Sequence, residues 1–129
     1  MKREREKHIT RLHIILFCIF LIGGLTIFFV LKYKAAEELN NYKKFEKELV
    51  NATKNYYKLN KIKIKEGFEI RIEMDTLVNK KFLSNDLTNE CKGYAIIGNI
   101  KTLEGDYELE YTGYIKCGDK YISDNYSNN

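Results

Sequence analysis

The chain has 129 residues, of which 44% are hydrophobic and 31% charged, and it contains no proline and eight glycines. This composition excludes an intrinsically disordered chain, a protein with several membrane spans and a collagen-like or proline-rich linker. The net charge of +4 lies mainly in residues 1–13, where five basic residues outnumber two acidic ones, whereas the chain from Lys32 onward is nearly balanced. Nucleic-acid-binding proteins concentrate basic residues on the folded domain, so this distribution argues against a nucleic-acid partner.

The first predicted elements are a basic arm over residues 1–13 and a transmembrane helix over residues 14–31. The eighteen residues of the span carry no charge, and as a helix they rise about 27 Å, close to the roughly 30 Å hydrocarbon core of a bilayer. A cleaved signal peptide is disfavoured, because Tyr33 and Lys34 stand where a signal peptidase requires small residues. The residues taken as the membrane anchor are Ile14, Phe20, Gly23, Gly24, Phe28 and Leu31.

The positive-inside rule gives the span an orientation. The arm places five basic residues within its first eleven positions, while the other flank has five lysines within sixteen. We therefore expect residues 1–13 to be cytoplasmic, the span to lie in the cell membrane and the C-terminal domain to be extracytoplasmic.

Residues 32–60 are predicted to continue the helix out of the membrane, because the stretch from Tyr33 to Leu59 contains neither glycine nor proline. Apolar positions recur there in alternating steps of three and four, which predicts one stripe along the helix. A partner helix in a coiled coil and the protein's own sheet are alternative partners for the stripe, and its short length with two tyrosines favours the sheet. The stripe consists of Tyr42, Phe45, Leu49, Ala52, Tyr56 and Leu59.

Residues 61–122 are predicted to form a small antiparallel β domain, because the apolar period changes from 3.6 to 2. Asp75 is expected to cap one short extra helix that ends near Phe82, and the Asn- and Ser-rich segment 123–129 is expected to be a flexible tail. The fold class is therefore α+β. The strand-like runs are 62–64, 68–74, 93–97 and 107–116, with turns at Glu66–Gly67 and at residues 104–106.

Cys91 and Cys117 lie in this domain, each at the edge of a strand-like run. We expect them to form a disulfide, which fits a small domain outside the cytoplasm. Two unpaired thiols or a metal site are the alternatives, but the chain has no histidine after His13 that could supply further ligands. Cys18 lies within the span and is expected to act as a small apolar residue.

Few residues of the domain are suited to catalysis. Both histidines, His8 and His13, precede or border the span, so no Ser–His or Cys–His pair can form in the domain. The carboxylates on the strands are interpreted as a solvated face rather than as an acid–base pair for glycoside hydrolysis: Glu69, Glu73, Glu108 and Glu110. No glycine-rich phosphate loop is present, and we expect no enzyme, metal, cofactor or small-molecule substrate.

Ten tyrosines and no tryptophan make an unusual aromatic set. Tyrosines exposed on a sheet form recognition surfaces, although tyrosine is also common in strands and fills sheet cores. The candidate binding surface consists of Tyr94, Tyr107, Tyr111 and Tyr114.

The layout and three segments of the chain are shared with one known class of protein. Residues 75–83 match a short element that precedes a sheet, and residues 91–94 and 113–117 match paired cysteine segments. In these features the chain resembles type IV pilin-like and pseudopilin-like proteins, including small ones of low-GC Gram-positive bacteria. Residues 10–14 lack the Gly-Phe-x-x-x-Glu motif that prepilin peptidase cleaves, so the resemblance implies an uncleaved relative that keeps the pilin shape.

The resemblance implies a non-enzymatic, single-pass envelope protein with a structural or assembly role, related to pili, pseudopili or secretion-type machinery. Its expected partners are the membrane and other membrane or envelope proteins. The alternative is a membrane-tethered extracellular binding module that recognises a protein or a cell-wall polymer through its tyrosine-rich sheet.

Overall fold

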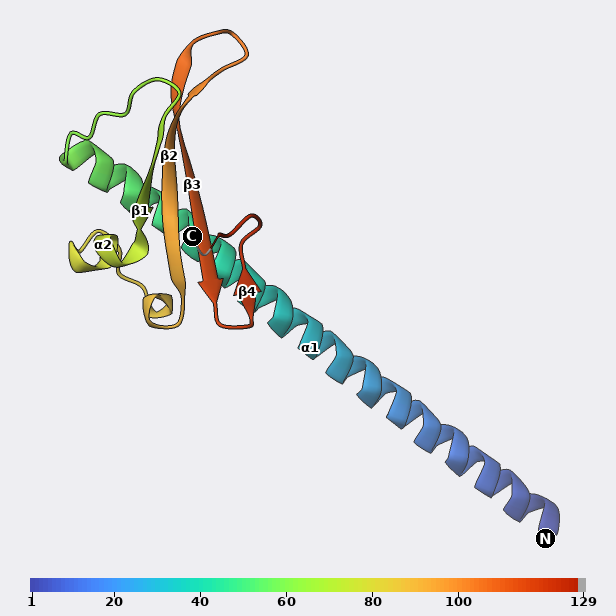
Figure 1. Ribbon diagram of the computed structural model, residues 1–129. Helices are drawn as coiled ribbons and strands as arrows, with labels where there is room; N and C mark the ends of the chain where they lie inside the picture. Colours follow the sequence, from blue (N-terminus) through green and yellow to red (C-terminus); the bar gives the residue numbers. More distant parts are fainter. Residues whose placement is uncertain (128–129) are drawn as a thin grey trace. The chain divides into compact units, whose positions relative to one another are not determined.

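The computed structural model describes residues 1–127, and the chain divides into two units, residues 1–38 and residues 39 onward. The predicted α+β class is confirmed: the chain has one long helix, a four-stranded antiparallel sheet and one short α-helix (Figure 1). The helical elements are α1 (Lys2–Leu59), α2 (Met74–Asn79) and a single 3-10 turn, η1 (Asp86–Asn89). The strands are β1 (Glu69–Glu73), β2 (Lys92–Lys101), β3 (Tyr107–Cys117) and β4 (Tyr121–Ile122).

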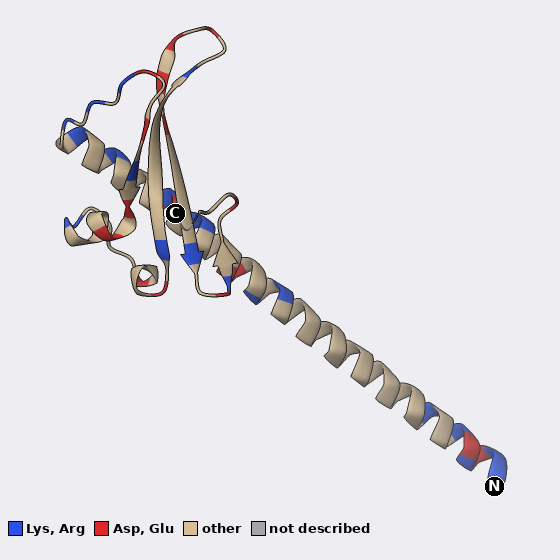
Figure 2. Cartoon of the chain, viewed as in Figure 1, with Lys and Arg blue, Asp and Glu red and all other residues tan. Residues whose placement is uncertain are grey.

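The first unit consists of the N-terminal part of α1. Lysines and arginines gather at its start, and the stretch that follows carries no charged side chain (Figure 2). This stretch makes α1 long and apolar enough to cross a membrane. None of the 18 residues in its most apolar part is buried. Its apolar side chains point outward around the helix, with Phe17 and Phe20 more than 60% exposed.

In the second unit, the C-terminal part of α1 packs on the sheet through the predicted stripe. Phe45 and Leu49 are fully buried and Ala52 is 4% exposed, and these side chains share one core with Ala95 of β2 and Ile115 of β3. The preference for the protein's own sheet over a partner helix is confirmed for this part of the stripe. Leu59 is 72% exposed, so the packed face ends before the helix does.

The sheet is a meander in the order β1-β2-β3-β4, with antiparallel neighbours throughout. The register pairs Ile72 with Ala95 and Ala95 with Gly113, and these positions form the face toward α1. The alternate positions, among them Arg71 and Tyr94, form the opposite face. The sheet therefore has one face in the core and one face turned away from α1.

Two sequence predictions about the domain need correction, and one strand was not predicted. Residues 62–64 alternate as a strand does but belong to no regular element, because no strand of the described chain lies beside them. Asp75 lies within the first turn of α2, and the N-cap position is Glu73, whose side chain makes no capping hydrogen bond. The helix ends at Asn79 rather than near Phe82. The short β4 was not predicted, since two residues are too few to show a period.

The segment expected to be a flexible tail from residue 123 is held against the sheet as far as it is described. Ser123 is buried, its amide donates to the Ile115 carbonyl oxygen at 2.9 Å, and its hydroxyl oxygen accepts from the Ile115 amide at 2.8 Å. Further along, the Ser127 amide donates to the Tyr94 hydroxyl oxygen at 2.9 Å. The rest of that predicted tail, residues 128–129, lies outside the described residues.

Gly113 allows α1 to approach the sheet closely. A Cβ atom at this position would lie 3.0 Å from the Glu46 carbonyl oxygen and 3.1 Å from a methyl group of Val50. The carbonyl oxygen belongs to the helix backbone and cannot rotate away, so any side chain at position 113 must push α1 and β3 apart.

We therefore expect Gly113→Ala to destabilise the domain by about 1–3 kcal/mol, the range seen when a well-packed core is overfilled. Denaturant unfolding of the purified full-length chain, followed by its tyrosine circular dichroism, measures the change. Gly98→Ala is the matched control, because the Cβ added there meets one side-chain methyl group of Ile100 at 3.2 Å and no backbone atom. Equal effects of the two substitutions would contradict the proposed tight contact between helix and sheet.

Candidate functional site

The anchor residues predicted from sequence all lie on α1, in the first unit. Ile14, Phe20, Phe28 and Leu31 are each more than 50% exposed. Apart from adjacent residues and the backbone of the helix itself, no atom of the described chain lies within 4 Å of the place where a Cβ of Gly23 or Gly24 would stand. The apolar segment is thus a surface without a partner in its own chain.

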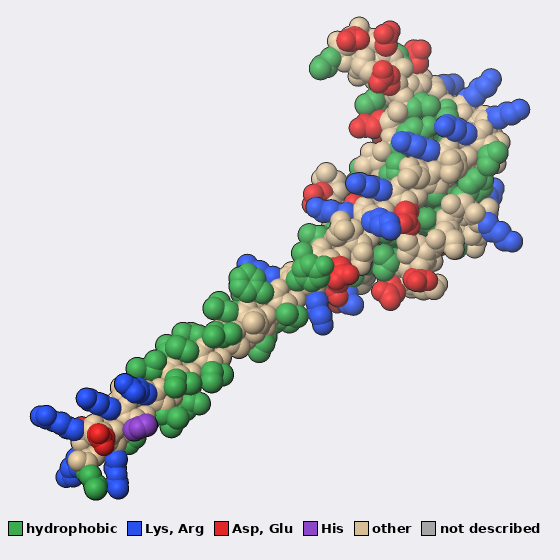
Figure 3. All heavy atoms as spheres, turned by 180° about the vertical axis from the view of Figure 1, so that it is seen from behind, with side chains coloured by type: hydrophobic (Ala, Val, Ile, Leu, Met, Phe, Trp, Pro, Cys, Tyr) green, Lys and Arg blue, Asp and Glu red, His purple; other side chains and the backbone are tan. Residues whose placement is uncertain are grey.

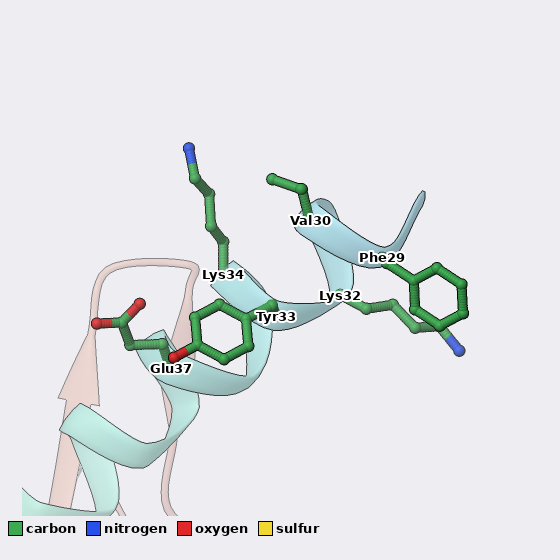
Figure 4. A pocket seen from close by; sticks show the side chains of 6 residues that line it. All are labelled: Phe29, Val30, Lys32, Tyr33, Lys34 and Glu37. Atoms are coloured by element: carbon green, nitrogen blue, oxygen red, sulfur yellow. The ribbon is translucent and has the colours of Figure 1, made fainter. Parts of the chain in front are cut away.

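The C-terminal end of this segment carries a mixture of apolar, aromatic and basic side chains, which line a shallow groove on one helix (Figure 4). The side chains that line it are Phe29, Val30, Lys32, Tyr33, Lys34 and Glu37. Lys32 extends back along the helix, with its Nζ atom 4.8 Å from the centre of the Phe28 ring. Tyrosine and lysine at the end of an apolar helix are typical of the boundary between lipid tails and headgroups.

Cys91 and Cys117 are joined by a disulfide, and both residues are buried, at 3% and 4% exposure. The bond links the residue before β2 to the last residue of β3 and lies within the hydrophobic core. The disulfide therefore joins the start of β2 to the end of β3, at one end of the sheet.

The four tyrosines proposed as a binding surface lie on both faces of the sheet rather than on a single face. Tyr94 and Tyr114 face each other across β2 and β3, with ring centres 5.1 Å apart, on the face turned away from α1. Tyr107 and Tyr111 lie at alternate positions of β3, on the face toward the helix, where the Tyr111 ring is 6.1 Å from that of Tyr57. The strand pleat divides the set between the two faces.

Tyr94 is also only 2% exposed, although it lies on the outer face. The Arg71 guanidinium stacks on its ring at 3.6 Å, and the ring of Tyr126 lies 5.5 Å away. A hydrogen bond from Arg71 to Glu73 raises the pKa of the guanidinium. Tyr94 is therefore covered by aromatic and charged side chains of its own chain.

Glu46 anchors the C-terminal part of the chain to α1. The Tyr121 hydroxyl donates to Glu46 Oε1 at 3.0 Å and the Ser123 hydroxyl donates to the same oxygen, while the ring of Tyr121 stacks on that of Tyr42 with centres 5.0 Å apart. Burial raises the pKa of the Tyr121 phenol, and its hydrogen bond to Glu46 raises it further. Sequence reasoning missed this group, because nothing local marks Glu46 among the other carboxylates of the helix.

Among residues 1–127, no group of three or more His, Cys, Asp or Glu side chains is arranged to hold a metal ion. Comparisons with known proteins give no further direction, since no family model, no curated protein and no solved structure matches this chain.

The raised pKa of Tyr121 predicts a loss of stability at alkaline pH. The hydrogen bond to Glu46 requires the protonated phenol, so its contribution is present below the ordinary tyrosine pKa of 10.0 and is lost as the pH rises through the higher folded-state value. At neutral pH, Tyr121→Phe is expected to lower the free energy of unfolding by about 1 kcal/mol. Above pH 10 the difference between the two proteins should shrink.

Unfolding midpoints measured from pH 7 to pH 11 test this, with Tyr111→Phe as the control. Burial also raises the pKa of Tyr111, so Tyr111→Phe shares the alkaline effect of burial. Its hydroxyl makes no hydrogen bond within the described chain, so this substitution should cost little stability at pH 7. If the unfolding midpoints of Tyr121→Phe and the unmodified protein differ by the same amount at every pH from 7 to 11, the role of the phenolic proton is contradicted.

We expect the disulfide to carry a large part of the stability of the domain. For a loop closed across 26 positions, the chain-entropy relation gives about 3.5 kcal/mol, and this is the expected loss in Cys91→Ala/Cys117→Ala. Urea unfolding of the full-length chain with and without reductant measures it, and Cys18→Ala, outside the domain, serves as the control. If the free energy of unfolding is the same with and without reductant, the disulfide contributes little to stability.

Proposed function

We propose that this chain is a non-enzymatic, single-pass envelope protein with a pilin-like extracytoplasmic domain and a structural or assembly role. The observation that carries the proposal is the continuity of α1, which joins an exposed apolar segment to a stripe buried in the core of the domain. In such an arrangement the membrane anchor and a core element of the domain belong to one helix.

The apolar segment supports a membrane anchor, because exposing its side chains to water would cost a large free energy. Fourteen large apolar side chains between residues 14 and 31 are exposed, and keeping them in water would cost on the order of 20 kcal/mol. This is more than the net stability of a typical domain, which is about 5–15 kcal/mol. A lipid environment, together with other helices, would remove this cost.

The pilin-like part of the proposal is supported by the layout of the domain. A helix that continues from the apolar segment packs on an antiparallel meander, and a disulfide closes the C-terminal part of the sheet. The prepilin cleavage motif is missing, so the chain would keep its basic arm on the cytoplasmic side. The binding-module alternative has less support, because the tyrosines on which it depended lie on two faces of the sheet.

Orientation is tested with single cysteines in a Cys18→Ala background. The native Cys91 and Cys117 are buried, so exposed positions have to be used instead. We expect a membrane-impermeant maleimide to label Ser84→Cys in intact cells and to label Lys7→Cys only after lysis. The reverse pattern would place the domain in the cytoplasm and would contradict both the orientation and the pilin-like role.

The assembly role predicts that the span contacts other proteins inside the membrane. A photoreactive phenylalanine analogue at position 20 or 28 should form adducts with a second protein chain on irradiation of intact membranes. Tyr42 and Phe45 are unsuitable for this test, because both are buried in the core of the domain. The same analogue at Ile122, exposed on the domain, provides the comparison, and adducts only with lipid at both span positions would favour a simple anchor and the binding module.

A further inference from the structure

One edge of β3 is open. β4 pairs only with Lys116 and Cys117, and Ser123 forms the hydrogen bonds to Ile115. In the part of the chain that the structure describes, no strand lies beside β3 between Tyr107 and Gly113. An open strand edge is a template for pairing with another chain unless the protein protects it.

The direction of the backbone groups at this edge follows from the hydrogen bonds at its ends. The N–H and C=O of Ile115 point toward Ser123, away from β2. In an antiparallel strand alternate residues point the same way, so the backbone groups of Leu109 and Tyr111 also point out of the sheet. On the partner strand, Asn99, which pairs with Leu109, directs its own backbone groups toward Gly67 and Phe68, as this pattern requires.

Side chains on the open edge alternate between apolar and acidic. Leu109 and Tyr111 lie on the face toward α1, whereas Glu108 and Glu110 lie on the opposite face. All of residues 107–110 are exposed, and acidic side chains gather at this end of the domain (Figure 3). On the side of α1, a groove of about 430 Å³ runs along the edge between Val50 and Gly113.

A second segment of the chain has the complementary pattern. Residues 61–65 read Lys-Ile-Lys-Ile-Lys, their three lysines are exposed, and they belong to no regular element. The carbonyl oxygen of Ile64 accepts a hydrogen bond from the Asn99 side chain at 3.0 Å. The carbonyl oxygen of Lys63 and the amide of Lys65 have no hydrogen bond within the described chain.

We propose that residues 62–65 of one copy of this chain add as a parallel strand to the open edge of β3 in a second copy. In a parallel pair, the amide of Leu109 donates to the carbonyl of Lys63 and the carbonyl of Leu109 accepts from the amide of Lys65. These are the two backbone groups that the segment leaves unused. Ile64 then aligns with Leu109 on the apolar face, and the Asn99 hydrogen bond to Ile64 is retained.

The same register brings opposite charges together on the other face. Lys63 lies beside Glu108 and Lys65 lies beside Glu110, since aligned residues of neighbouring strands share a face. Among residues 1–127, the structure shows no ion pair that involves these two lysines or these two glutamates. The lysines and the acidic hairpin lie at the same end of the domain (Figure 2).

Two other pairings fit less well. If two β3 edges met antiparallel over residues 107–113, Glu110 of one copy would stand opposite Glu110 of the other, and like charges in that position repel. If residues 62–65 added antiparallel through the unused groups of Lys63 and Lys65, both lysines would lie on the apolar face beside Leu109. Charge and hydrogen bonding agree only in the parallel register.

This inference rests on the assembly role proposed above and names a second copy as one partner. It is tested with two double variants of the full-length chain, Lys63→Glu/Lys65→Glu and Glu108→Lys/Glu110→Lys. Each variant alone places like charges at the contact, so we expect its self-association constant in detergent solution to fall about tenfold or more. An equimolar mixture of the two variants restores opposite charges at both contacts, and association should return to the unmodified level.

Carbodiimide crosslinking of mixed ¹⁵N- and ¹⁴N-labelled chains identifies the register. We expect intermolecular crosslinks between positions 63 and 108 and between positions 65 and 110, in the unmodified chain and in the mixture of variants. Lys92→Glu/Lys120→Glu changes the charge by the same amount at exposed positions away from the segment and should leave association unchanged. All of the substituted positions are exposed, and the tyrosine circular dichroism of each variant verifies its fold.

A chain that stays monomeric at all concentrations overturns the inference, and so does association that charge reversal leaves intact. Crosslinks from position 63 to a different protein would assign the segment to another partner and would overturn it as well. This test and the test of the proposed function can fail separately. If positions 20 and 28 crosslink to another protein but the chain does not self-associate, the assembly role stands and this inference fails. If the chain self-associates but neither span position crosslinks to a protein, the contact at the edge of β3 stands and the assembly role of the span fails.

Discussion

The contact between α1 and the sheet is the interaction on which the rest of the domain depends. A helix gains most of its stability from packing an apolar face, because helix propensity alone is marginal in water. Here Phe45 and Leu49 are fully buried, and Gly113 lets the backbone of α1 lie directly against β3. The position of the helix in turn places the Glu46 carboxylate where it accepts from both Tyr121 and Ser123. The C-terminal part of the chain is therefore held by a residue whose location the core packing has already fixed.

This arrangement stabilises the two ends of the sheet unequally. At one end, the Cys91–Cys117 disulfide, β4 and the Glu46 group connect the strands to one another and to α1. At the other end, the β2–β3 hairpin extends past the packed face, and Leu103 at its tip is fully exposed. The hairpin end therefore keeps strand edges and charged side chains exposed.

The elements that could be predicted from the sequence are those in which local pattern and tertiary packing agree. The apolar span, the stripe on α1 and β3 each show a clear period, and Gly67 and Gly105 occur at turns whose positive φ angles suit glycine. The segment 62–64 has an equally clear period but no neighbouring strand in its own chain, and pairing is a tertiary property. β4 and Glu46 depend on contacts between distant residues, which leave no local signal. The predicted tyrosine surface overlooked the alternation of side chains along a strand. Tyr111 and Tyr114 are three positions apart in one strand, and this odd spacing places them on opposite faces of the sheet.

The domain carries both an alternating Lys-Ile segment and an acidic, unpaired strand edge, and the two are complementary in charge. A protein that needed only to protect the edge of β3 would do so with Glu108 and Glu110 alone, since edge charges block indiscriminate pairing. Glu108 and Glu110 can also select a partner if the added strand is basic, as residues 62–65 are. An acidic strand would be repelled by the two carboxylates, whereas a basic strand is attracted. Exposed ion pairs and one short strand provide a weak contact by themselves. Anchoring in a shared membrane would raise the effective concentration of the copies, and a weak, selective edge is then sufficient for reversible association without the aggregation that a strong apolar edge would cause.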